Sequence, residues 1–538
     1  MFKRLLLAAL PAALLASTAI AADAPRPVIL QVGLSEKAAA PVSGRLIVFA
    51  RPWDAAKEAN KGADPTEVDA NPMAPDEVFM AAQEAPRLAP GQSVTINTDQ
   101  TAFPAGFSSL KPGTYAVQAV LDVNHSYAYG GRTPDDPVSA VVKMEIGSGA
   151  ELPALQLAPG GAALDIWSLP PWASPEVRKA YEAQKPFIQK LDFVSPALSA
   201  FSGRPIHMRG WVVTPPGYSA ASKTRYPTVY WTHGFGGQLN SILSTAVRYS
   251  QEMQSGDIPP MIYVVLDESL PTGTHEFADS VNNGPWGKAL TTELIPDLEK
   301  HYRMDARTRG RFLTGHSSGG WATLWLQTRY PKVFGGTWST SPDPSDFHDF
   351  TGIDLYAPNA SAYHHVDGAV NPLVRDKGKV VSTFEQYARS EAVQGEYGGQ
   401  ISSFDWVFSP RGADGRPLPM FNRVTGEVDP AVATYWKDHF DIVARLQRDW
   451  KTLKPDLDGK IHLVVGTADT FYLDGPAHRL KAALDGLGAK SEFVFVDGRT
   501  HFDLYKVGDD KRGLEKAIAR AMYRVARPPV AAKKKAHR

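Results

Sequence analysis

One pentapeptide of the form G-x-S-x-G, Gly315-His316-Ser317-Ser318-Gly319, has the residue types that covalent catalysis by a hydroxyl group requires. The β-prone run Arg311–Thr314 leads into it, and the helix-like run Gly320–Leu326 leaves it. That strand–turn–helix setting is typical of a nucleophile elbow, in which a sharp turn exposes a serine side chain. Glycine suits the two flanking positions because the strand and the helix approach closely there. The pattern predicts Ser317 as a nucleophile, and the alternative is an ordinary turn rich in glycine and serine.

A second glycine-rich segment, His233-Gly234-Phe235-Gly236-Gly237, follows the β-prone run Thr228–Thr232. In a fold with a nucleophile elbow, such a loop supplies backbone N–H groups that stabilise a developing oxyanion. We expect the N–H of Phe235 to be the loop donor, with Gly236 as the alternative. The amide that follows the nucleophile, Ser318, is the expected second donor. The alternative interpretation of this loop is a turn without a ligand.

A base and an acid for Ser317 are expected later in the chain, in the order serine, acid, histidine. His501 lies in a glycine-containing loop after the β-prone run Glu492–Val496. Asp469 follows the run Ile461–Val465, and an acid at a strand end can hold the histidine tautomer and stabilise its protonated form. Asp474 is the competing acid by the same argument. The sequence thus predicts a triad of Ser317, Asp469 and His501.

The elements around these residues alternate between strand-like and helix-like runs from about residue 204 to 526. Such alternation indicates βαβ units and a mostly parallel sheet, so the fold class is α/β. Three helix-like stretches stand out, at about 289–302, 319–330 and 477–487. Residues 342–455 interrupt the rhythm with many Asp, Gly, Pro and aromatic residues, and we interpret them as an insertion over one end of the sheet. The predicted strands are 206–213, 228–232, 261–267, 311–314, 336–339, 461–465 and 492–496.

The preceding part of the chain, residues 25–160, is β-rich. Short β-prone runs are separated there by Pro, Gly and Asp clusters, a pattern that predicts a small β-sandwich domain. His125, Tyr127 and Tyr129 form an aromatic-rich loop that either faces a ligand or packs as a turn. Residues 161–203 are expected to connect the two domains and to contain a helix over Pro175–Leu191.

The two ends of the chain are expected to lie outside the folded domains. Lys3 and Arg4 precede an apolar run to Ala16, and Ala19-Ile20-Ala21 offers a small-residue cleavage site, so residues 1–21 predict a signal peptide. The run is too short for a membrane span of about 20 residues, and an uncleaved anchor is the alternative. Residues 527–538 predict a disordered basic tail. The mature protein is expected to be periplasmic or secreted, without membrane insertion.

The composition excludes several classes of function. With 57 Lys and Arg against 57 Asp and Glu, the chain is electrically balanced, which argues against a nucleic-acid binder. The absence of cysteine excludes thiol catalysis, disulfide bonds and Cys-ligated metal sites. An acidic loop followed by two histidines has ligand types that suit a divalent cation, but its spacing matches no known metal motif. We therefore expect a polar loop rather than a metal site at Asp343, Asp346, His348, Asp349 and His364-His365.

Residues 200–525, about three-fifths of the chain, resemble the esterase family of α/β-hydrolases, which includes esterase D-like, feruloyl, acetylxylan and enterochelin esterases. A β-sandwich in front of such a domain is similar to the layout of enterochelin esterases. The insertion at 342–455 is longer than the usual crossover of the family. The matching motifs are His233-Gly234-Phe235-Gly236-Gly237, Gly284-Pro285-Trp286, Glu293-Leu294-Ile295-Pro296, Gly315-His316-Ser317-Ser318-Gly319-Gly320 and Gly498-Arg499-Thr500-His501-Phe502.

The resemblance implies a serine hydrolase that acts on carboxylic esters, with Ser317, Asp469 and His501 at the triad positions. Together with the predicted signal peptide, it predicts an exported serine esterase that cleaves a small-molecule or carbohydrate-linked ester and needs no metal or organic cofactor. Trp286 and Tyr472 are candidate apolar walls of its pocket, although each is equally well a core residue. An acyltransferase of the same fold is an alternative, which competition between water and an alcohol acceptor would reveal. A binding protein that has lost catalysis is the third class, and a serine that fails to react with a fluorophosphonate would indicate it.

Overall fold

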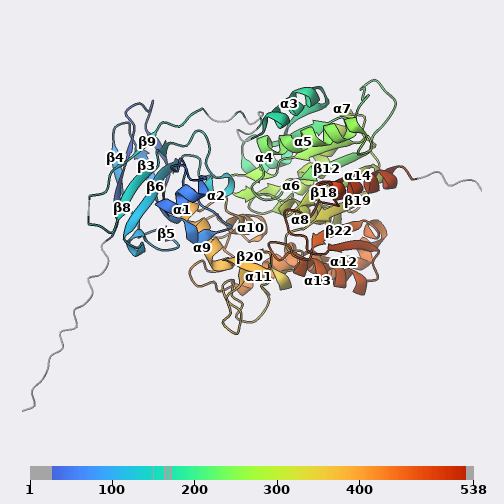
Figure 1. The fold of residues 1–538 in the computed structure, drawn as a ribbon. Coiled ribbons are helices and arrows are strands. Elements are labelled where there is room, and N and C mark those ends of the chain that lie inside the picture. The colour runs from blue at the N-terminus through green and yellow to red at the C-terminus, as the bar shows by residue number, and fades with distance from the viewer. Residues whose placement is uncertain (1–26, 150, 163–164, 166–168, 170–172, 529–538) are drawn as a thin grey trace, which may run out of the picture.

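A computed structural model describes residues 27–149, 151–162, 165, 169 and 173–528 of the chain. The predicted signal peptide lies outside the described residues, as does nearly all of the predicted basic tail. The described chain forms a β-rich part and an α/β part, with a helical segment between them (Figure 1).

The strands of the β-rich part belong to one nine-stranded sheet in the order β4-β1-β9-β7-β6-β2-β3-β5, with β8 paired to β6. A β-sandwich predicts two separate sheets, whereas hydrogen bonds join all nine strands here. The sheet nevertheless folds over a shared core, in which Val32 packs with Val48 and Val117. Short helices α1 (Trp53–Ala59) and α2 (Tyr127–Gly130) accompany it. The strands are β1 (Ile29–Leu34), β2 (Val42–Pro52), β3 (Phe79–Leu88), β4 (Ser93–Asn97), β5 (Ala102–Phe103), β6 (Gly113–Asp122), β7 (Val138–Ser139), β8 (Val142–Ile146) and β9 (Leu155–Ala158).

The α/β part is built on an eight-stranded sheet in the order β10-β11-β13-β12-β18-β19-β22-β23. Within this order, neighbouring strands from β13 to β23 pair parallel. At one edge, β11 pairs antiparallel with both β10 and β13. All seven predicted strands are present, with ends shifted by one or two residues. The central strands are buried on both faces, which explains their nearly continuous apolar sequences. The strands are β10 (Ile188–Val194), β11 (His207–Val213), β12 (Thr228–Thr232), β13 (Ile262–Leu266), β18 (Arg311–His316), β19 (Gly336–Thr340), β22 (Ile461–Gly466) and β23 (Ser491–Val496).

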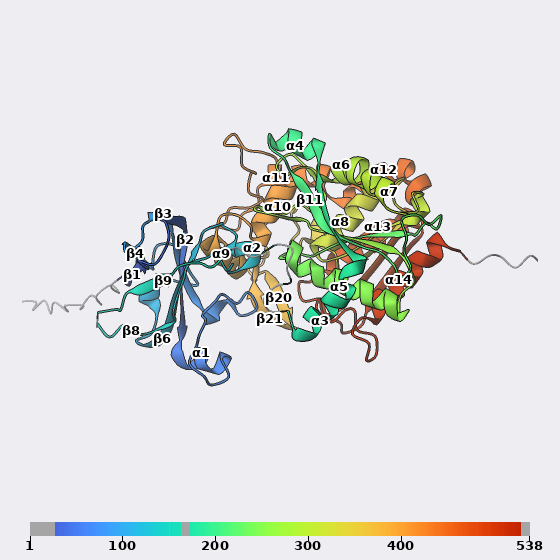
Figure 2. The ribbon, with the colours of Figure 1, turned by 90° about the horizontal axis from the view of Figure 1, so that it is seen from above.

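Helices cover both faces of this sheet (Figures 1 and 2). On one face, α5 (Leu239–Ser255) and α14 (Gly513–Ala526) share a core with the strands, and α3 (Pro175–Gln184) packs on α5. The helices of the other face are α6 (Trp286–Ala289), α7 (Ile295–His301), α8 (Ser318–Arg329), α12 (Ile442–Leu457) and α13 (Asp474–Gly486). Between β13 and α6 lie two small hairpins, β14 (Ser269–Leu270) with β15 (Gly273–Thr274) and β16 (Asp279–Ser280) with β17 (Gly284–Pro285).

The prediction of one helix over Pro175–Leu191 is wrong in its second half. The α-helix ends at Gln184, where Pro186 lacks the N–H that a continuing helix needs. The chain then forms β10, which extends the main sheet before the predicted start of the domain at 204. A short helix that was not predicted, α4 (Pro196–Ser202), follows, and the Ser195 hydroxyl caps it.

The insertion at 342–455 fills the space between the two sheets (Figures 1 and 2). It contains the antiparallel hairpin β20 (Pro372–Asp376) with β21 (Lys379–Thr383) and the helices α9 (Phe384–Gln394), α10 (Gln400–Phe408) and α11 (Pro430–His439). Helix α9 packs against β3 and β5 of the β-rich part. The last residues of the segment, 442–455, form most of α12. This helix packs on α8 and leads to β22, so the end of the insertion is a regular crossover helix between two parallel strands. Among the described helices, none has the length and apolarity needed to cross a membrane.

Candidate functional site

Ser317 stands at the turn between β18 and α8 with φ +59° and ψ −125°. A non-glycine residue at positive φ is strained, and such strain concentrates at functional turns. The turn is tight: a Cβ on Gly315 would lie 2.3 Å from the carbonyl oxygen of Gly319. A Cβ on Gly319 would lie 2.4 Å from the carbonyl oxygen of His233, in the glycine-rich loop after β12. Both glycines are therefore required for the elbow to sit against that loop.

His501 and Asp469 meet beyond the ends of β23 and β22. The Nδ1 atom of His501 is 3.0 Å from Oδ2 of Asp469, and both side chains are buried. The other oxygen of Asp469 accepts the N–H of Phe471 at 3.0 Å, which fixes the carboxylate. Burial alone would raise the pKa of Asp469, but the hydrogen bond and charge of His501 bring that pKa below its ordinary value. This arrangement holds a proton on Nδ1 and leaves Nε2 free to act as a base.

Asp474, the competing acid, is occupied elsewhere. It is the first residue of α13, and its Oδ1 accepts a hydrogen bond from Nη2 of Arg375 at 2.8 Å. The same guanidinium donates through Nε to the carbonyl oxygen of Asp469 at 2.7 Å. Asp469 is therefore the carboxylate that contacts His501. Asp474 instead forms an ion pair with Arg375, whose guanidinium also binds the backbone of Asp469.

The ring of His501 is surrounded by other rings. Phe471 meets it edge-on at 4.9 Å, and the ring of His316, the residue before Ser317, is 4.3 Å away. Burial, together with the proximity of His501, lowers the pKa of His316 to about 3. His316 is therefore neutral, and its uncharged ring lies beside the ring of His501.

Asp343 is a carboxyl group beside Ser317 that the triad prediction does not include. Its Oδ1 is 3.4 Å from the Ser317 hydroxyl, and its Oδ2 accepts the Ser318 hydroxyl at 2.6 Å. The residue follows β19, the strand next to β18. Burial raises its pKa to about 6, although the hydroxyl groups oppose that shift. Asp343 thus titrates close to neutrality in direct contact with the serine hydroxyl.

The glycine-rich loop after β12 passes directly beside Ser317. A Cβ on Gly234 would lie 3.1 Å from that of Ser317. His233 holds the loop: its Nδ1 donates to the Gly234 carbonyl at 2.7 Å, and its Nε2 accepts the N–H of Glu268 at 2.9 Å. The loop is also held from outside, because the Tyr129 hydroxyl donates to the Gly237 carbonyl at 2.6 Å.

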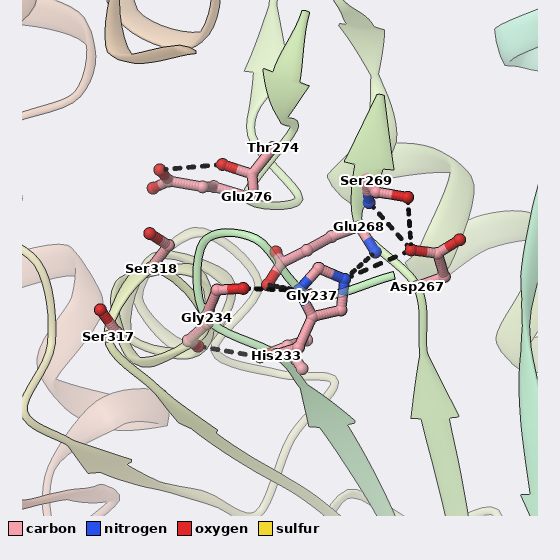
Figure 3. Close-up of polar contacts among 12 residues, drawn as sticks. His233, Gly234, Gly237, Asp267, Glu268, Ser269, Thr274, Glu276, Ser317 and Ser318 are labelled. Carbon is pink, nitrogen blue, oxygen red and sulfur yellow. Dashed lines mark hydrogen bonds and ion pairs between the residues drawn. The ribbon is translucent and has the colours of Figure 1, made fainter. Parts of the chain in front are cut away.

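Two further carboxyl groups, those of Glu268 and Glu276, are fully buried near this loop. Figure 3 shows their side chains extending toward the loop and Ser318 from the segment after β13. Among the described residues, neither oxygen of Glu268 has a hydrogen-bond partner, and its Oε1 lies 3.9 Å from Nδ1 of His233. Glu276 contacts the Thr274 hydroxyl at 3.5 Å. Burial raises the pKa of Glu268 to about 8 and raises that of Glu276 strongly, with a contribution from Asp343 in both cases. Both groups are therefore neutral acids at neutral pH.

A small cavity of about 30 Å³ adjoins Ser317, with room for about one water molecule. Its wall is largely apolar and comes mainly from the insertion, including Phe350, Phe384 and Phe404. The two predicted pocket residues do not line it. Trp286 is buried with its ring stacked on His275 at 3.7 Å, and the ring of Tyr472 lies under the Arg375 guanidinium at 4.3 Å.

The acidic loop considered as a cation site has other partners. Asp346 accepts from Arg479 at 2.8 Å, and His348 pairs with Asp354 at 3.1 Å. In the part of the chain that the structure describes, no three His, Asp or Glu side chains are grouped so that they could hold a metal ion.

Sequence reasoning did not assign a role at the site to Asp343, Glu268 or Glu276. Asp343 was considered only as part of the acidic loop, and no local motif marks the two glutamates. Tyr129 was noted as one residue of an aromatic loop, but nothing in the sequence shows that this loop meets the segment after β12. Only the tertiary structure brings these groups to Ser317.

Comparison with known proteins was made at three levels. A family model described as "Putative esterase" matches residues 203–484, just over half of the chain, including Ser317 and Asp469. A search of curated proteins found no match. Among solved structures, the chain is similar to a ferulic acid esterase from Anaeromyces mucronatus in complex with ferulic acid, with 16% identity and a TM-score of 0.34 over 62% of this chain and 89% of that one.

Two other solved structures are similar to this chain with comparable sequence identities and TM-scores. An S-formylglutathione hydrolase from Agrobacterium tumefaciens is 14% identical, with a TM-score of 0.36 over 63% of this chain and 94% of that one. A fluorophosphonate-binding serine hydrolase from Staphylococcus aureus is 13% identical, with a TM-score of 0.36 over 63% and 98%. Because the family model spans more than half of the sequence, the chain belongs to the esterase family and is a carboxylic ester hydrolase.

Proposed function

We propose that this protein is an exported serine esterase in which Ser317 is the nucleophile, His501 the general base and Asp469 the residue that orients the base. The observation that carries the proposal is the contact of 3.0 Å between His501 Nδ1 and Asp469 Oδ2. It supports the assignment because the pair lies beyond the same sheet edge as the strained turn of Ser317.

The proposed reaction begins with attack of the Ser317 hydroxyl oxygen on the ester carbonyl, while His501 Nε2 takes the hydroxyl proton. The backbone N–H groups of Phe235 and Ser318 stabilise the oxyanion of the tetrahedral intermediate. His501 then returns its proton to the alcohol as the C–O bond breaks, which leaves an acyl group on Ser317. Water, activated by His501, hydrolyses this acyl-enzyme and regenerates the serine.

The size of the cavity beside Ser317 supports a short acyl group. About 30 Å³ admits a methyl group, whereas an aromatic acid requires movement of the surrounding side chains. The substrate class that we propose is a small-molecule ester or an ester carried on a carbohydrate.

The proposal of export depends on residues 1–21. Lys3 and Arg4, the apolar run and Ala19-Ile20-Ala21 support cleavage after Ala21. Protein recovered from the periplasm or the medium should begin at Ala22, as determined by N-terminal sequencing. A chain that keeps Met1 in every fraction would contradict this part of the proposal.

The catalytic proposal is tested with p-nitrophenyl esters from acetate to octanoate, using the wild-type chain and Ser317→Ala. We expect hydrolysis that is fastest for acetate and that falls on the order of 10⁴-fold or more without the serine hydroxyl. Equal rates for the two proteins would overturn the assignment of Ser317. Product analysis with an added alcohol separates hydrolysis from acyl transfer, because an acyltransferase would form a new ester.

A further inference from the structure

A second cavity, of about 270 Å³, lies between the β-rich part and the α/β part. Its wall combines four segments of the chain: residues 69–75 of the β-rich part, the α2 region, the loop after β12, and α9 of the insertion. Figure 2 shows α2 and α9 meeting where the two parts of the molecule join. The β-rich part therefore contributes directly to this cavity.

The cavity adjoins the proposed reaction centre. Phe235, whose N–H is a proposed oxyanion donor, lines it. Tyr387 of α9 lines both this cavity and the small cavity beside Ser317. One side of an ester held at Ser317 fits only a short acyl group, so the larger cavity is the available place for the alcohol portion.

Aromatic rings contribute four of the lining residues, Tyr127, Tyr129, Phe235 and Tyr387. Their neighbours fix several of these rings. Tyr129 meets Phe235 edge-on at 5.0 Å while its hydroxyl binds the Gly237 carbonyl. Tyr127 stacks on Phe49 at 5.6 Å, and its hydroxyl donates to Asp69. The rings are thus positioned before any ligand arrives, which lowers the cost of binding.

The charged groups in the wall are acidic. Asp69 and Glu391 line the cavity, and none of the described lining residues is Lys or Arg. Arg132 lies 3.5 Å from Asp69 and offsets part of its charge. Glu391 accepts the N–H groups of Gln400 and Ile401, and burial raises its pKa to about 7, so a bound cation would favour its ionised form.

Carboxyl groups behind the wall act in the same direction. Burial raises the pKa of Tyr129 and of Tyr387, and nearby carboxyl groups raise both further, Asp267 and Glu268 in the case of Tyr129 and Glu391 and Asp343 in the case of Tyr387. The cavity is therefore bordered by carboxyl groups from the segment after β13, from the segment after β19 and from α9. An anionic ligand would be repelled from it.

Resting on the proposed esterase function, we propose that this cavity binds an ammonium group on the alcohol portion of the ester substrate. Several fixed aromatic rings combined with carboxylates are the chemistry that recognises alkylammonium ions, through cation–π attraction and charge. The β-rich part thereby contributes to substrate specificity through Tyr127, Tyr129 and Asp69.

The first test compares acetylcholine with 3,3-dimethylbutyl acetate, its uncharged analogue of the same shape. Both carry the acetyl group that the cavity beside Ser317 accommodates. We expect kcat/KM for acetylcholine to be at least about tenfold higher. Equal values, or a preference for the uncharged ester, would overturn the proposal.

The second test places a cation in the cavity with Gln394→Lys and uses Gln394→Met as the matched neutral control. Gln394 lies in the last turn of α9, lines the cavity and is partly exposed, so both side chains are tolerated. The lysine should reduce the preference for acetylcholine at least fivefold, and the methionine should leave it unchanged. The preference is the ratio of kcat/KM for acetylcholine to kcat/KM for 3,3-dimethylbutyl acetate in the same variant, so a loss common to both esters cancels. An unchanged preference in Gln394→Lys would contradict the assignment of this cavity.

Binding of choline, measured by calorimetry, separates this proposal from the catalytic one. Choline should bind the wild-type chain and bind Gln394→Lys at least fivefold more weakly. If p-nitrophenyl acetate is hydrolysed through Ser317 but choline does not bind, the esterase stands and the ammonium site is wrong. If choline binds but no ester is hydrolysed, the cavity assignment stands and the proposed function is wrong.

Discussion

At the scale of single residues, the site depends on carboxyl groups in three different states. Asp469 is ionised because His501 and a backbone N–H stabilise its charge. The Asp343 carboxyl group, beside the Ser317 hydroxyl, has its pKa raised to about 6 by burial. The Glu268 carboxyl group is buried, finds no hydrogen-bond partner among the described residues and stays neutral at neutral pH. The environment of each carboxyl group, more than its residue type, determines whether the group is ionised at neutral pH.

Replacement of Asp469 by asparagine keeps the size of the side chain but removes the charge that stabilises protonated His501. We expect kcat for p-nitrophenyl acetate to fall about 10³- to 10⁴-fold. Asp474→Asn is the matched control, because Asp474 pairs with Arg375 and should cost less than tenfold. A larger loss in Asp474→Asn than in Asp469→Asn would reverse the assignment of the acid.

Replacement of Glu268 by glutamine tests its neutral state through stability. Its pKa is about 8 in the folded chain, against 4.5 for an ordinary glutamate. Between these values the unfolded chain loses a proton that the folded chain keeps, so folding becomes less favourable as pH rises. The free energy of unfolding of the wild type should fall relative to Glu268→Gln by about 1.4 kcal/mol for each pH unit between about pH 5 and 8.

Urea unfolding of both proteins at pH 5, 6 and 7 gives this difference. Glu67→Gln, at an exposed glutamate with 62% of its side chain accessible, is the control and should show no such trend. Parallel pH profiles for the wild type and Glu268→Gln would mean that Glu268 is already ionised in the folded chain.

At the scale of elements, three loops and the start of one helix form the site. The turn after β18 presents Ser317, the loop after β12 lies against it, and the loops after β22 and β23 bring Asp469 and His501 together. Helix α2 of the β-rich part supports the loop after β12 through the bond from Tyr129 to Gly237. The loop that carries Phe235, one of the two proposed oxyanion donors, is therefore held by a segment from outside the α/β part.

Loss of that bond in Tyr129→Phe should loosen the loop with little change to the aromatic packing. We expect kcat for p-nitrophenyl acetate to fall about three- to tenfold with KM nearly unchanged, since the loop acts on the transition state. Tyr115→Phe is the control, because its hydroxyl also donates to a backbone carbonyl, that of Lys111, within the β-rich part. A rise in KM alone, or equal effects of both variants, would argue against a role in positioning the loop.

Several elements could be predicted because their sequences are strongly patterned. The strands β12, β18 and β22 are apolar runs followed by glycine or by small polar residues, and the site residues lie directly after them. Helix α5 is not among the predicted helices, because no clear start signal separates it from the glycine-rich loop. The predicted helix over Pro175–Leu191 overlaps the start of β10, because pairing with β11 decides the structure there and leaves no local signal. The contacts that form the cavity between the β-rich part and the α/β part, and those that bury Glu268, join segments distant in sequence. They therefore leave no signal in the local sequence.

At the scale of the whole molecule, the insertion joins the two sheets. Val393 of α9 is buried in a core of the β-rich part, and Arg45 of β2 donates to the carbonyl oxygens of Val393 and Ala392 at 2.8 and 3.1 Å. Helix α9, which contributes to the wall of the cavity beside Ser317, is thus fixed to the β-rich part. We therefore expect changes at this contact to alter both the stability of the fold and the shape of the cavity.

Replacement of Arg45 by methionine removes these two bonds at the end of α9. The free energy of unfolding should fall by about 1–3 kcal/mol, and amide exchange in α9 should accelerate more than in β18. Arg51→Met is the matched control on the same strand, because Arg51 pairs with Glu77 of the β-rich part. Equal exchange in α9 for both variants would contradict the coupling.

The most direct test of the catalytic assignment is the site of fluorophosphonate labelling, located by mass spectrometry. A nucleophilic serine reacts with this probe whatever its natural substrate. We expect one adduct in the wild-type chain, on Ser317, and no adduct in Ser317→Ala. An adduct on another residue, or none at Ser317 while ester hydrolysis persists, would contradict it.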